Sequence, residues 1–475
     1  MKFSKKKVGE FPTYKGFGDL VNYKSTIKAT VIVCGIVLIL FMAKWVLGMA
    51  SGALSSVSYA TAKLVGEQVG EPMELDEFGN INVLIAGYGG ENHDGGYLTD
   101  SMMIASFNPK LGTVTFLSVP RDLYVKINTG YYSRINGMYR SWYLQGKDSP
   151  TRDEDAIFKL ADKMEEISGL EIPYYMMIDF EGLVKLVDAV GGVEVEVKET
   201  IHDTEYPGPN HSYTIFHLDQ GKQLIDGETA LKYARSRHST SDFSRSYRQQ
   251  QIIEGVMHKM LGSISLTQLG KVRDTYNLFT SMIETNIGVK QVLWLVGYLN
   301  KPIRFFSFVY SADCSTTVFA YATPGCVLYN ANRADFWGAA TLLPQGATVG
   351  NISYYKHTQD FAFWVAHNQE FLLEAAPVRI LNGIDADRAK KEGYNVNGVA
   401  GEAATNLKLK GFLIDDIKNA SGFFDQTTVI VSETGAYAHT VELLHAFIDI
   451  PLEHVSPLYG SGVTIVLGQD YLEKL

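Results

Sequence analysis

An uncharged apolar stretch near the N-terminus sets the strongest limit on how this 475-residue chain can fold. Residues 29–43 carry no charge, and the apolar run continues beyond Lys44 to Ala50. A helix over 29–50 is about 33 Å long, enough to cross the hydrocarbon core of a bilayer. Residues 1–28 contain seven lysines against two acids, and such a basic flank stays on the cytoplasmic side. The sequence therefore predicts a cytoplasmic tail over 1–28, one transmembrane helix and an external body.

A cleaved signal peptide is the alternative, since Ala60-Thr61-Ala62 has the small residues that cleavage sites require. The long basic leader, and the distance of this triplet from the apolar run, favour an uncleaved anchor. We therefore expect a single-pass protein of the cell membrane whose large C-terminal part is extracellular. In an oxidising exterior Cys314 and Cys326 can form a disulfide, and two buried thiols are the alternative.

The charge of the chain is divided unevenly between leader and body. The net charge is −10, and the leader carries +5, so the remaining residues carry −15. An acidic body argues against nucleic acid as the main partner, because phosphate backbones are bound mostly by Lys and Arg. The full sequence is 46% apolar and 12% aromatic, so most of the chain is not a disordered polymer and can bury a large core.

The body is predicted to be an α/β fold in which helices pack around a mixed central sheet. Short runs rich in β-branched and aromatic residues predict strands, and a 3.6-residue apolar period predicts helices. The predicted strands are 81–86, 102–107, 114–119, 174–178 and 193–197. The predicted helices are 152–168, 182–190, 244–261 and 289–299.

The domain plan follows from these elements. Residues 51–79 are small and polar and are predicted to form a stalk, and the main domain is placed at 80–310. Residues 311–376 are rich in aromatic residues without a clear period and are left as an unassigned connection. A smaller α/β domain is expected over 377–475, with strands at 378–383, 427–431 and 463–468 and a helix near 439–447.

Two familiar site motifs fail when they are tested. Gly87-Tyr88-Gly89-Gly90 follows a strand, but the sixth position of a dinucleotide-binding G-x-G-x-x-G motif is Asn92 and no helical pattern follows. A second group of polar residues lies in a Gly, Pro and Asn-rich segment that we interpret as a solvated loop, because it lacks metal-ligand spacing. Its members are His202, Asp203, His211 and His217.

Residues 232–248 (KYARSRHSTSDFSRSYR) carry a net charge of +4 within this acidic body. Arg235 and Arg237 are two apart, so they point the same way in an extended chain. Arg245, Arg248 and Gln249 are spaced i, i+3 and i+4, so they share one face of a helix. Guanidinium groups grip phosphate oxygens in a planar, bidentate way, and the segment is therefore predicted to bind a phosphate-bearing anion.

A second candidate cluster lies at strand ends, where loops often carry functional groups. Asp100 begins one strand, and Arg121 and Asp122 follow the next. A carboxylate such as Asp100 suits Mg²⁺, and Arg121 can join the phosphate grip.

Several segments together resemble the LytR-CpsA-Psr family of cell-wall polymer ligases. They occur in the family's order over about residues 80–262: TDSMM (99–103), SVPRDLYV (118–125), RING (134–137), DFEGLVKLVDAVGGVEV (179–195), LIDGETALKYARSRH (224–238) and DFSRSYRQQ (242–250). The tail from Val378 is similar to the LytR C-terminal domain. The resemblance implies an α/β/α main domain and an external body with an N-terminal anchor.

The resemblance also implies an activity, that of a Mg²⁺-dependent phosphotransferase. Such enzymes move a glycopolymer, for example a teichoic acid or capsule, from a polyprenyl-pyrophosphate carrier to peptidoglycan. Carried over by position, Arg121, Asp122, Arg235 and Arg237 would be catalytic, and Asp100 would bind the metal. The pyrophosphate would be held by Arg121, Arg235, Arg237, Arg245, Arg248 and Gln249. A carrier lipid also needs an apolar groove, which helices 182–190 and 250–261 can line.

One departure affects the metal site. The family usually has a second metal-binding Asp where this chain has Gly89. Asp94 is our first candidate for the missing carboxylate, followed by Glu91 and His93, and a plain polar turn over 91–96 is the alternative. A hydrolase of polyprenyl pyrophosphates and a non-catalytic membrane-anchored protein that binds wall polymer or lipid remain as alternative functions.

Overall fold

The computed structural model describes residues 71–91, 93, 95–208, 212–236, 242–262, 282–288, 290–291, 294, 303–312, 326–448, 452–456 and 462–474. The predicted cytoplasmic tail, the apolar segment 29–50 and most of the helix predicted over 289–299 lie outside these residues. Among the helices that the structure describes, none combines the length and apolarity needed to cross a membrane. Cys326 is disulfide-bonded, and Cys314, its predicted partner, lies outside the described residues.

A six-stranded mixed sheet organises the main domain, in the order β11-β6-β1-β2-β3-β12. β2 is antiparallel to β1 and β3, whereas β6 runs parallel to β1 and β12 parallel to β3. The strands are β1 Ile81–Tyr88, β2 Thr99–Asn108, β3 Thr113–Ser118, β6 Tyr174–Asp179, β11 Ile283–Thr285 and β12 Arg304–Val309. The mixed sheet and the strands predicted at 81–86, 102–107, 114–119 and 174–178 are therefore confirmed.

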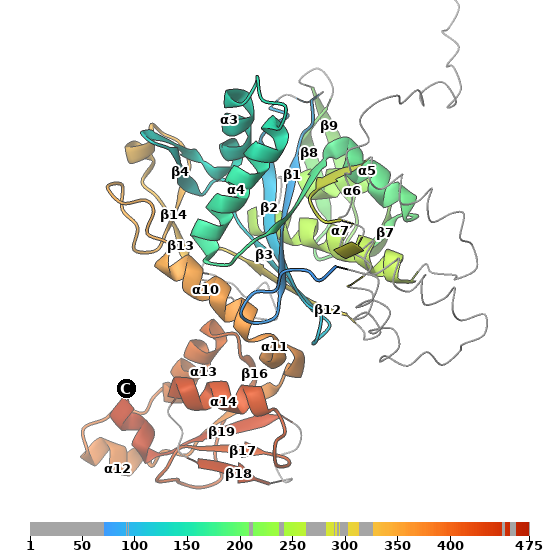
Figure 1. Cartoon of the computed structure of the whole chain (residues 1–475). Coiled ribbons are helices and arrows are strands. Elements are labelled where there is room, and N and C mark those ends of the chain that lie inside the picture. The colour runs from blue at the N-terminus through green and yellow to red at the C-terminus, as the bar shows by residue number, and fades with distance from the viewer. Residues whose placement is uncertain are drawn as a thin grey trace, which may run out of the picture.

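Both faces of the sheet are covered, because the four central strands β6, β1, β2 and β3 are buried along almost their whole length. Alternate side chains enter different cores: Leu84 and Ala86 join one cluster, and Val83 and Ile85 join the other. Figure 1 shows the corresponding helices on opposite sides of the sheet. The first side has α3 Met138–Gln145, α4 Arg152–Ser168 and α10 Lys356–His367, and the second has α5 Phe180–Ala189, α6 Gly227–Arg235 and α7 Asp242–Gly262.

Helix ends on the second side are fixed by acidic N-caps. The carboxylate of Asp179 accepts a hydrogen bond from the Gly182 backbone N–H at 2.6 Å and starts α5. Asp226 accepts from the Thr229 N–H at 2.8 Å and starts α6, and these hydrogen bonds lower the pKa of Asp226. The helices predicted at 152–168, 182–190 and 244–261 are confirmed.

One prediction about a loop is wrong. The segment around His202 and His217 forms two paired strands, β8 Ile201–Pro207 and β9 Tyr213–Leu218, instead of an irregular solvated loop. Strand alternation turns Asp203 inward, where it is 1% exposed and accepts a hydrogen bond from the Ser236 hydroxyl at 2.8 Å. His202 and His217 face outward with their Nδ1 atoms 3.3 Å apart. The described residues contain no group of three metal-ligating side chains, and His211 lies outside them.

Shorter two-stranded units flank the main sheet. β7 Val193–Val197, as predicted, pairs with β10 Gly221–Ile225, and β4 Tyr124–Asn128 pairs with β5 Tyr131–Arg134 before the 3-10 helix η1 Ile135–Gly137. The unassigned region contains β13 Leu328–Asn330, the 3-10 helix η3 Arg333–Phe336 and β14 Leu342–Pro344. It ends with α10 and α11 Gln369–Glu374, and α10 packs on α4.

The C-terminal domain contains a second, five-stranded sheet in the order β16-β15-β19-β17-β18. Figure 1 shows β16, β17, β18 and β19 together with α13 and α14. The strands are β15 Pro377–Asn382, β16 Leu413–Asn419, β17 Thr428–Val431, β18 Leu452–Val455 and β19 Val463–Leu467. The helices are α12 Ala386–Lys391, α13 Val399–Leu409 and α14 Ala438–Ile448, followed by η5 Gln469–Lys474. The three predicted strands and the helix near 439–447 are confirmed, and β16 and β18 were not predicted.

Candidate active site

The strand directions bring distant segments of the sequence to one edge of the main sheet. β1, β3 and β6 end at this edge, and β2 begins there because it runs antiparallel to β1 and β3. Asp100 and Ser101 are the second and third residues of β2, and Ser101 pairs with Gly87 of β1. Arg121 lies three residues after Ser118, the last residue of β3. The predicted meeting of Asp100 with the 118–122 segment is confirmed.

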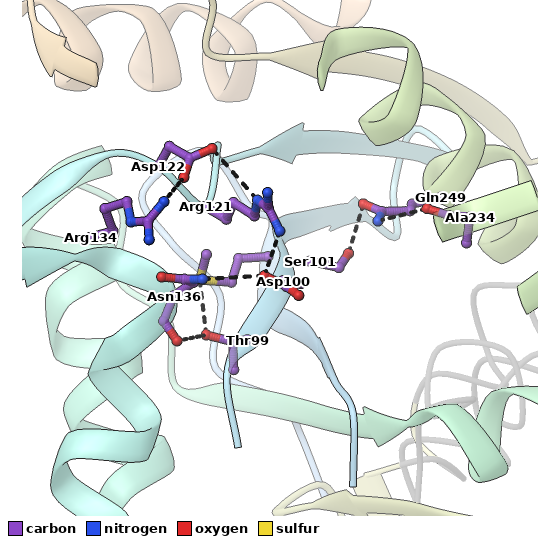
Figure 2. A network of polar contacts seen from close by, with 10 residues as sticks. Thr99, Asp100, Ser101, Arg121, Asp122, Arg134, Asn136, Ala234 and Gln249 are labelled. Carbon is purple, nitrogen blue, oxygen red and sulfur yellow. Dashed lines mark hydrogen bonds and ion pairs between the residues drawn. The ribbon is translucent and has the colours of Figure 1, made fainter. Parts of the chain in front are cut away.

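Asp100 is the centre of a polar network (Figure 2). Its Oδ1 accepts hydrogen bonds from Nη1 of Arg121 at 3.0 Å and from Nδ2 of Asn136 at 3.2 Å. The backbone carbonyl of Asn136 accepts in turn from the Thr99 hydroxyl at 3.3 Å. These contacts fix the start of β2 against η1, so the carboxylate of Asp100 is held at the sheet edge.

Asp122 connects two arginines at the same edge. Its Oδ1 accepts from Nη1 of Arg134 at 2.9 Å, and its Oδ2 lies 3.5 Å from Nε of Arg121 (Figure 2). Arg121 is thus held between the carboxylates of Asp100 and Asp122. Its Nε is buried and forms no hydrogen bond within the part of the chain that the structure describes, so its polar contact there is the ion pair with Asp122.

Helix α7 contributes the other side of the site through Arg245 and Gln249. Arg245 is 8% exposed. The side-chain oxygen of Gln249 accepts from the Ser101 hydroxyl at 2.9 Å, and its amide nitrogen donates to the Ala234 carbonyl at 3.4 Å (Figure 2). Gln249 therefore ties α6, α7 and β2 together.

Arg235, the last residue of α6, is held by aromatic rings. Its guanidinium carbon lies 4.3 Å from the ring centre of Phe180 and 5.7 Å from that of Tyr206, whose hydroxyl is 3.4 Å from Nη1. Nη2 lies 3.1 Å from Nε2 of His93. Burial raises the pKa of Tyr206, and the charge of Arg235 opposes this effect.

Arg248 has a different environment from the other predicted phosphate ligands. It is 4% exposed, and its Nε donates to the Tyr233 carbonyl at 2.8 Å while Nη2 donates to the Ser236 carbonyl. Burial lowers the pKa of Arg248 to about 10. Its guanidinium thus satisfies carbonyls at the C-terminal end of α6 and does not line the cavities described next.

Two cavities share one polar wall at this edge. The shared residues are Asp100, Ser101, Arg121, Arg245 and Gln249. The smaller cavity, about 200 Å³, is otherwise mostly apolar and includes Met103, Ile178, Leu183, Leu231, Ile252 and Ile253. The larger one, about 420 Å³, has a mixed lining that includes Pro120, Asp122, Ser246, Asn330 and Leu342. Leu183, Ile252 and Ile253 come from the helices that were predicted to line an apolar groove.

The structure thus brings together Arg121, Arg235, Arg245 and Gln249 with Asp100, as predicted. Arg237 and Asp94 lie outside the described residues. Sequence reasoning missed Ser101 and Asn136, although both stand inside the quoted TDSMM and RING segments. It also missed Phe180, which follows the N-cap Asp179 and lies within the quoted segment 179–195.

The side chains at the edge can be tested for a fit to Mg²⁺. Asp100 supplies one carboxylate, and both of its hydrogen bonds among the described residues are accepted by Oδ1. At Gly89 a Cβ atom would lie 3.1 Å from Cβ and Nδ1 of His93, so His93 fills the space that a second carboxylate would need. Mg²⁺ is often held by one or two carboxylates together with substrate phosphates and water. The described residues fit an ion of this kind with Asp100 as protein ligand.

A further acid lies behind the site. Burial, and then the nearby charges of Asp153 and Asp179, raise the pKa of Glu284 on β11 to about 7. Burial also raises the pKa values of Tyr88 and Tyr139 above their ordinary range. The surroundings of Glu284, Tyr88 and Tyr139 therefore disfavour additional negative charge. The arginines Arg121, Arg235 and Arg245 favour it.

The comparison with known families fits this arrangement. The model of the LytR_cpsA_psr family matches residues 50–323, which is more than half of the chain. The chain belongs to the LytR-CpsA-Psr family. A second model, described as LytR cell envelope-related transcriptional attenuator, matches residues 375–471 and so covers the C-terminal domain.

Relatives of this LytR-CpsA-Psr protein are named polyisoprenyl-teichoic acid–peptidoglycan teichoic acid transferase TagU. The one from Oceanobacillus iheyensis is 30% identical over 196 residues, which are 41% of this chain and 56% of that protein. The chain thus spans little more than half of that relative's length. The one from Bacillus anthracis is 27% identical over 268 residues, 52% of this chain and 80% of that protein.

Two solved structures are also similar to parts of this chain. The crystal structure of B. subtilis TagV is 20% identical and covers 60% of this chain and 98% of its own, with a TM-score of 0.42. The structure of TagT bound to LI-WTA is 19% identical and covers 62% of this chain and 92% of its own, with a TM-score of 0.41.

Proposed function

We propose that this protein is a phosphotransferase that attaches an anionic cell-wall glycopolymer, carried on polyprenyl pyrophosphate, to peptidoglycan. The observation that carries the proposal is the position of two arginines in the wall that the two cavities share. Arg121 and Arg245 stand between a mostly apolar cavity and a more polar one. A polyprenyl-pyrophosphate-linked saccharide has a matching arrangement: its apolar chain suits the apolar cavity, its pyrophosphate suits the arginines, and its sugars suit the more polar cavity. The names of the TagU relatives support the same reaction class.

The chemistry required of the protein is mainly positioning and neutralisation of charge. Phosphoryl transfer builds charge on the equatorial oxygens, and prearranged guanidinium groups stabilise it. Arg121, Arg235 and Arg245 hold the pyrophosphate. Gln249 positions the elements that carry them through its hydrogen bonds to Ser101 and Ala234. Asp122 positions Arg121, and we place Arg248 among the positioning residues because it secures the end of α6.

A magnesium ion, when bound, supplies neutralisation of the phosphate charge. Asp100 would hold it, and Arg121 would keep the Asp100 carboxylate oriented. Arg237 and Asp94 remain candidates for the pyrophosphate and metal sites, respectively. The helix over 29–50 would anchor the protein in the cell membrane with the body outside, where peptidoglycan is available and where the carrier lipid lies.

The test uses the full-length protein in detergent with a polyprenyl-pyrophosphate-linked saccharide, peptidoglycan and Mg²⁺. Arg235→Lys is expected to lower transfer by ~10³, because a point charge cannot replace a bidentate guanidinium that neutralises the phosphate. Arg388→Lys is the matched control, since Arg388 forms ion pairs with Glu392 and Asp425 in the C-terminal domain. Normal transfer by Arg235→Lys would contradict the assigned role of this arginine.

The same experiment separates the alternative functions. Release of free saccharide phosphate with no product on peptidoglycan would identify a hydrolase. Binding of the lipid-linked saccharide without any turnover would identify a non-catalytic binding protein. Covalently labelled peptidoglycan is the result expected from the proposal.

A further inference from the structure

The larger cavity has a wall that neither family model covers. Residues 324–374 lie between the two matched ranges. Within them, Asn330 at the end of β13 and Leu342 at the start of β14 line the larger cavity and not the apolar one. The hairpin β13–η3–β14 therefore completes this cavity from outside the segments that define the family.

Hydrogen bonds join this hairpin to the loop that carries the site. The backbone N–H of Leu342 donates to the Asp122 carbonyl at 3.0 Å, and Leu342 forms an isolated parallel bridge with Leu123. The N–H of Leu328 donates to the Ser311 carbonyl at 2.9 Å. Because Asp122 lines the same cavity, the hairpin and the phosphate-binding loop form one connected wall.

The geometry of phosphoryl transfer assigns a role to this cavity. The attacking and leaving oxygens lie roughly in line on opposite sides of the phosphorus. If the leaving polyprenyl phosphate occupies the apolar cavity, the attacking hydroxyl approaches from the other side of the shared wall. That side is the larger cavity, whose polar groups include Asp122, Ser246 and Asn330. The hydroxyl oxygen bonds to phosphorus as the P–O bond to polyprenyl phosphate breaks, and the hydroxyl proton is balanced by the released polyprenyl phosphate.

The tip of the hairpin carries an unusual tryptophan. Trp337 is 90% exposed and has a left-handed backbone with φ 53° and ψ 32°. Bulky residues rarely adopt this conformation, and an exposed indole gains nothing from burial in the folded chain. The N–H of Gly338 donates to the Arg333 carbonyl at 2.8 Å, which fixes the turn and directs Trp337 outward.

The residue before Trp337 packs against the segment that follows Asp122. The preceding residue, Phe336, packs edge to face on Tyr124 with 4.8 Å between ring centres. Tyr124 is two residues after Asp122. Trp337 therefore lies on the hairpin whose two strands each contribute a residue to the polar cavity. An exposed aromatic ring is suited to a saccharide, because a pyranose has an apolar C–H face and a rim of hydroxyls.

We propose that the larger cavity and Trp337 together bind the acceptor glycan. Asn330 and Asp122 face the sugar whose hydroxyl attacks the phosphorus, and the indole of Trp337 stacks on a further ring of the same chain. This inference rests on the proposed function, because it takes the pyrophosphate to lie at the shared wall.

Calorimetry on the full-length chain in detergent tests the proposal without turnover. The probes are farnesyl pyrophosphate for the apolar side and a tetramer of β-1,4-linked N-acetylglucosamine for the acceptor. Trp337→Ala and Asn330→Ala are each expected to weaken tetrasaccharide binding at least tenfold while farnesyl pyrophosphate binds as before. Phe423→Ala is the matched control, because it removes a 73% exposed aromatic ring from the C-terminal domain, and it should change neither affinity.

The outcomes separate this inference from the proposed function. A wild-type chain that does not bind farnesyl pyrophosphate would refute the proposed function itself. A chain that binds farnesyl pyrophosphate, but binds the tetrasaccharide equally well with and without Trp337, would overturn only the acceptor site. If Trp337→Ala instead weakens a disaccharide-bearing farnesyl pyrophosphate and leaves the free tetrasaccharide unchanged, the cavity holds the donor sugar and the acceptor assignment is wrong.

Discussion

His93 packs against Gly89 at the edge of the main sheet, so closely that a side chain at position 89 would crowd it. A Cβ atom on Gly89 would lie 3.1 Å from both Cβ and Nδ1 of His93, which is closer than nearly all such contacts in proteins. From this position Nε2 of His93 reaches Nη2 of Arg235 at 3.1 Å. The absence of a side chain at position 89 therefore leaves room for His93 beside Arg235, which we propose binds the pyrophosphate.

Gly89→Ala tests this fit. We expect a loss of roughly 1–2 kcal/mol in stability, because overpacking forces neighbouring atoms to move. In a His93→Gly background the loss should shrink, since two of the three close contacts at Gly89 come from His93 and only the Cα of Gly96 remains. Thermal unfolding of the four chains measures this coupling.

A matched glycine provides the control for that cycle. Gly401 in α13 has open space where its Cβ would lie, so Gly401→Ala should be neutral or stabilising. Equal losses from Gly89→Ala with and without the His93 side chain would show that the two residues are not coupled.

Arg248→Met is expected to destabilise the main domain by a few kcal/mol. The change keeps much of the side-chain volume but leaves the buried carbonyls of Tyr233 and Ser236 without their donor, and each such loss costs about 1–3 kcal/mol. Arg245→Met should instead weaken pyrophosphate binding with a smaller effect on stability. Urea unfolding and farnesyl pyrophosphate binding are measured on both variants. If Arg248 were the ligand, Arg248→Met would weaken binding more than Arg245→Met does and would destabilise the domain less.

Glu284 gives the main domain a specific pH dependence. Because the folded-state pKa is raised from 4.5 to about 7, folding favours the protonated acid. The associated stability is fully present below about pH 4.5 and is lost as the pH rises through 7. Glu284→Gln should therefore match the wild type near pH 4 and be more stable by roughly 2–3 kcal/mol at pH 8. Unfolding midpoints against pH measure this, with the exposed Glu77→Gln as a control that should follow the wild type.

Asp100→Asn should raise the half-saturating Mg²⁺ concentration of the transfer reaction sharply, because it removes the one carboxylate that the described residues place at the shared wall. Asp94→Asn should raise it to a smaller extent if Asp94 supplies a second carboxylate. Magnesium titrations of turnover compare the two. An unchanged curve for Asp94→Asn would leave Asp100 and the substrate phosphates as ligands, and an unchanged curve for Asp100→Asn would remove it from the metal site.

Much of the fold was accessible from the sequence because it depends on local patterns. The α4 helix begins at Arg152 and ends at Ser168 as predicted, since its apolar residues follow a 3.6-residue period and Gly169 adopts the left-handed conformation after it. The strands β1, β2 and β3 follow from β-branched runs bounded by turns. β16 was missed because its sequence, LIDDIKN, is polar and mostly exposed at the edge of its sheet.

The residue types alone were enough to nominate Arg121, Arg235, Arg245 and Asp100, since guanidinium groups suit phosphate and a carboxylate suits magnesium in any fold. Which of these residues lie close together depends on the packing of the folded chain. Arg245 and Arg248 are both buried on one helix, yet the packing of α6 against α7 sends Arg248 to backbone carbonyls and leaves Arg245 in the cavity wall. Likewise Asn330 and Leu342 reach the site through a hairpin distant in sequence, because hydrogen bonding to the Asp122 loop depends on spatial contact and leaves no periodic signal in the chain.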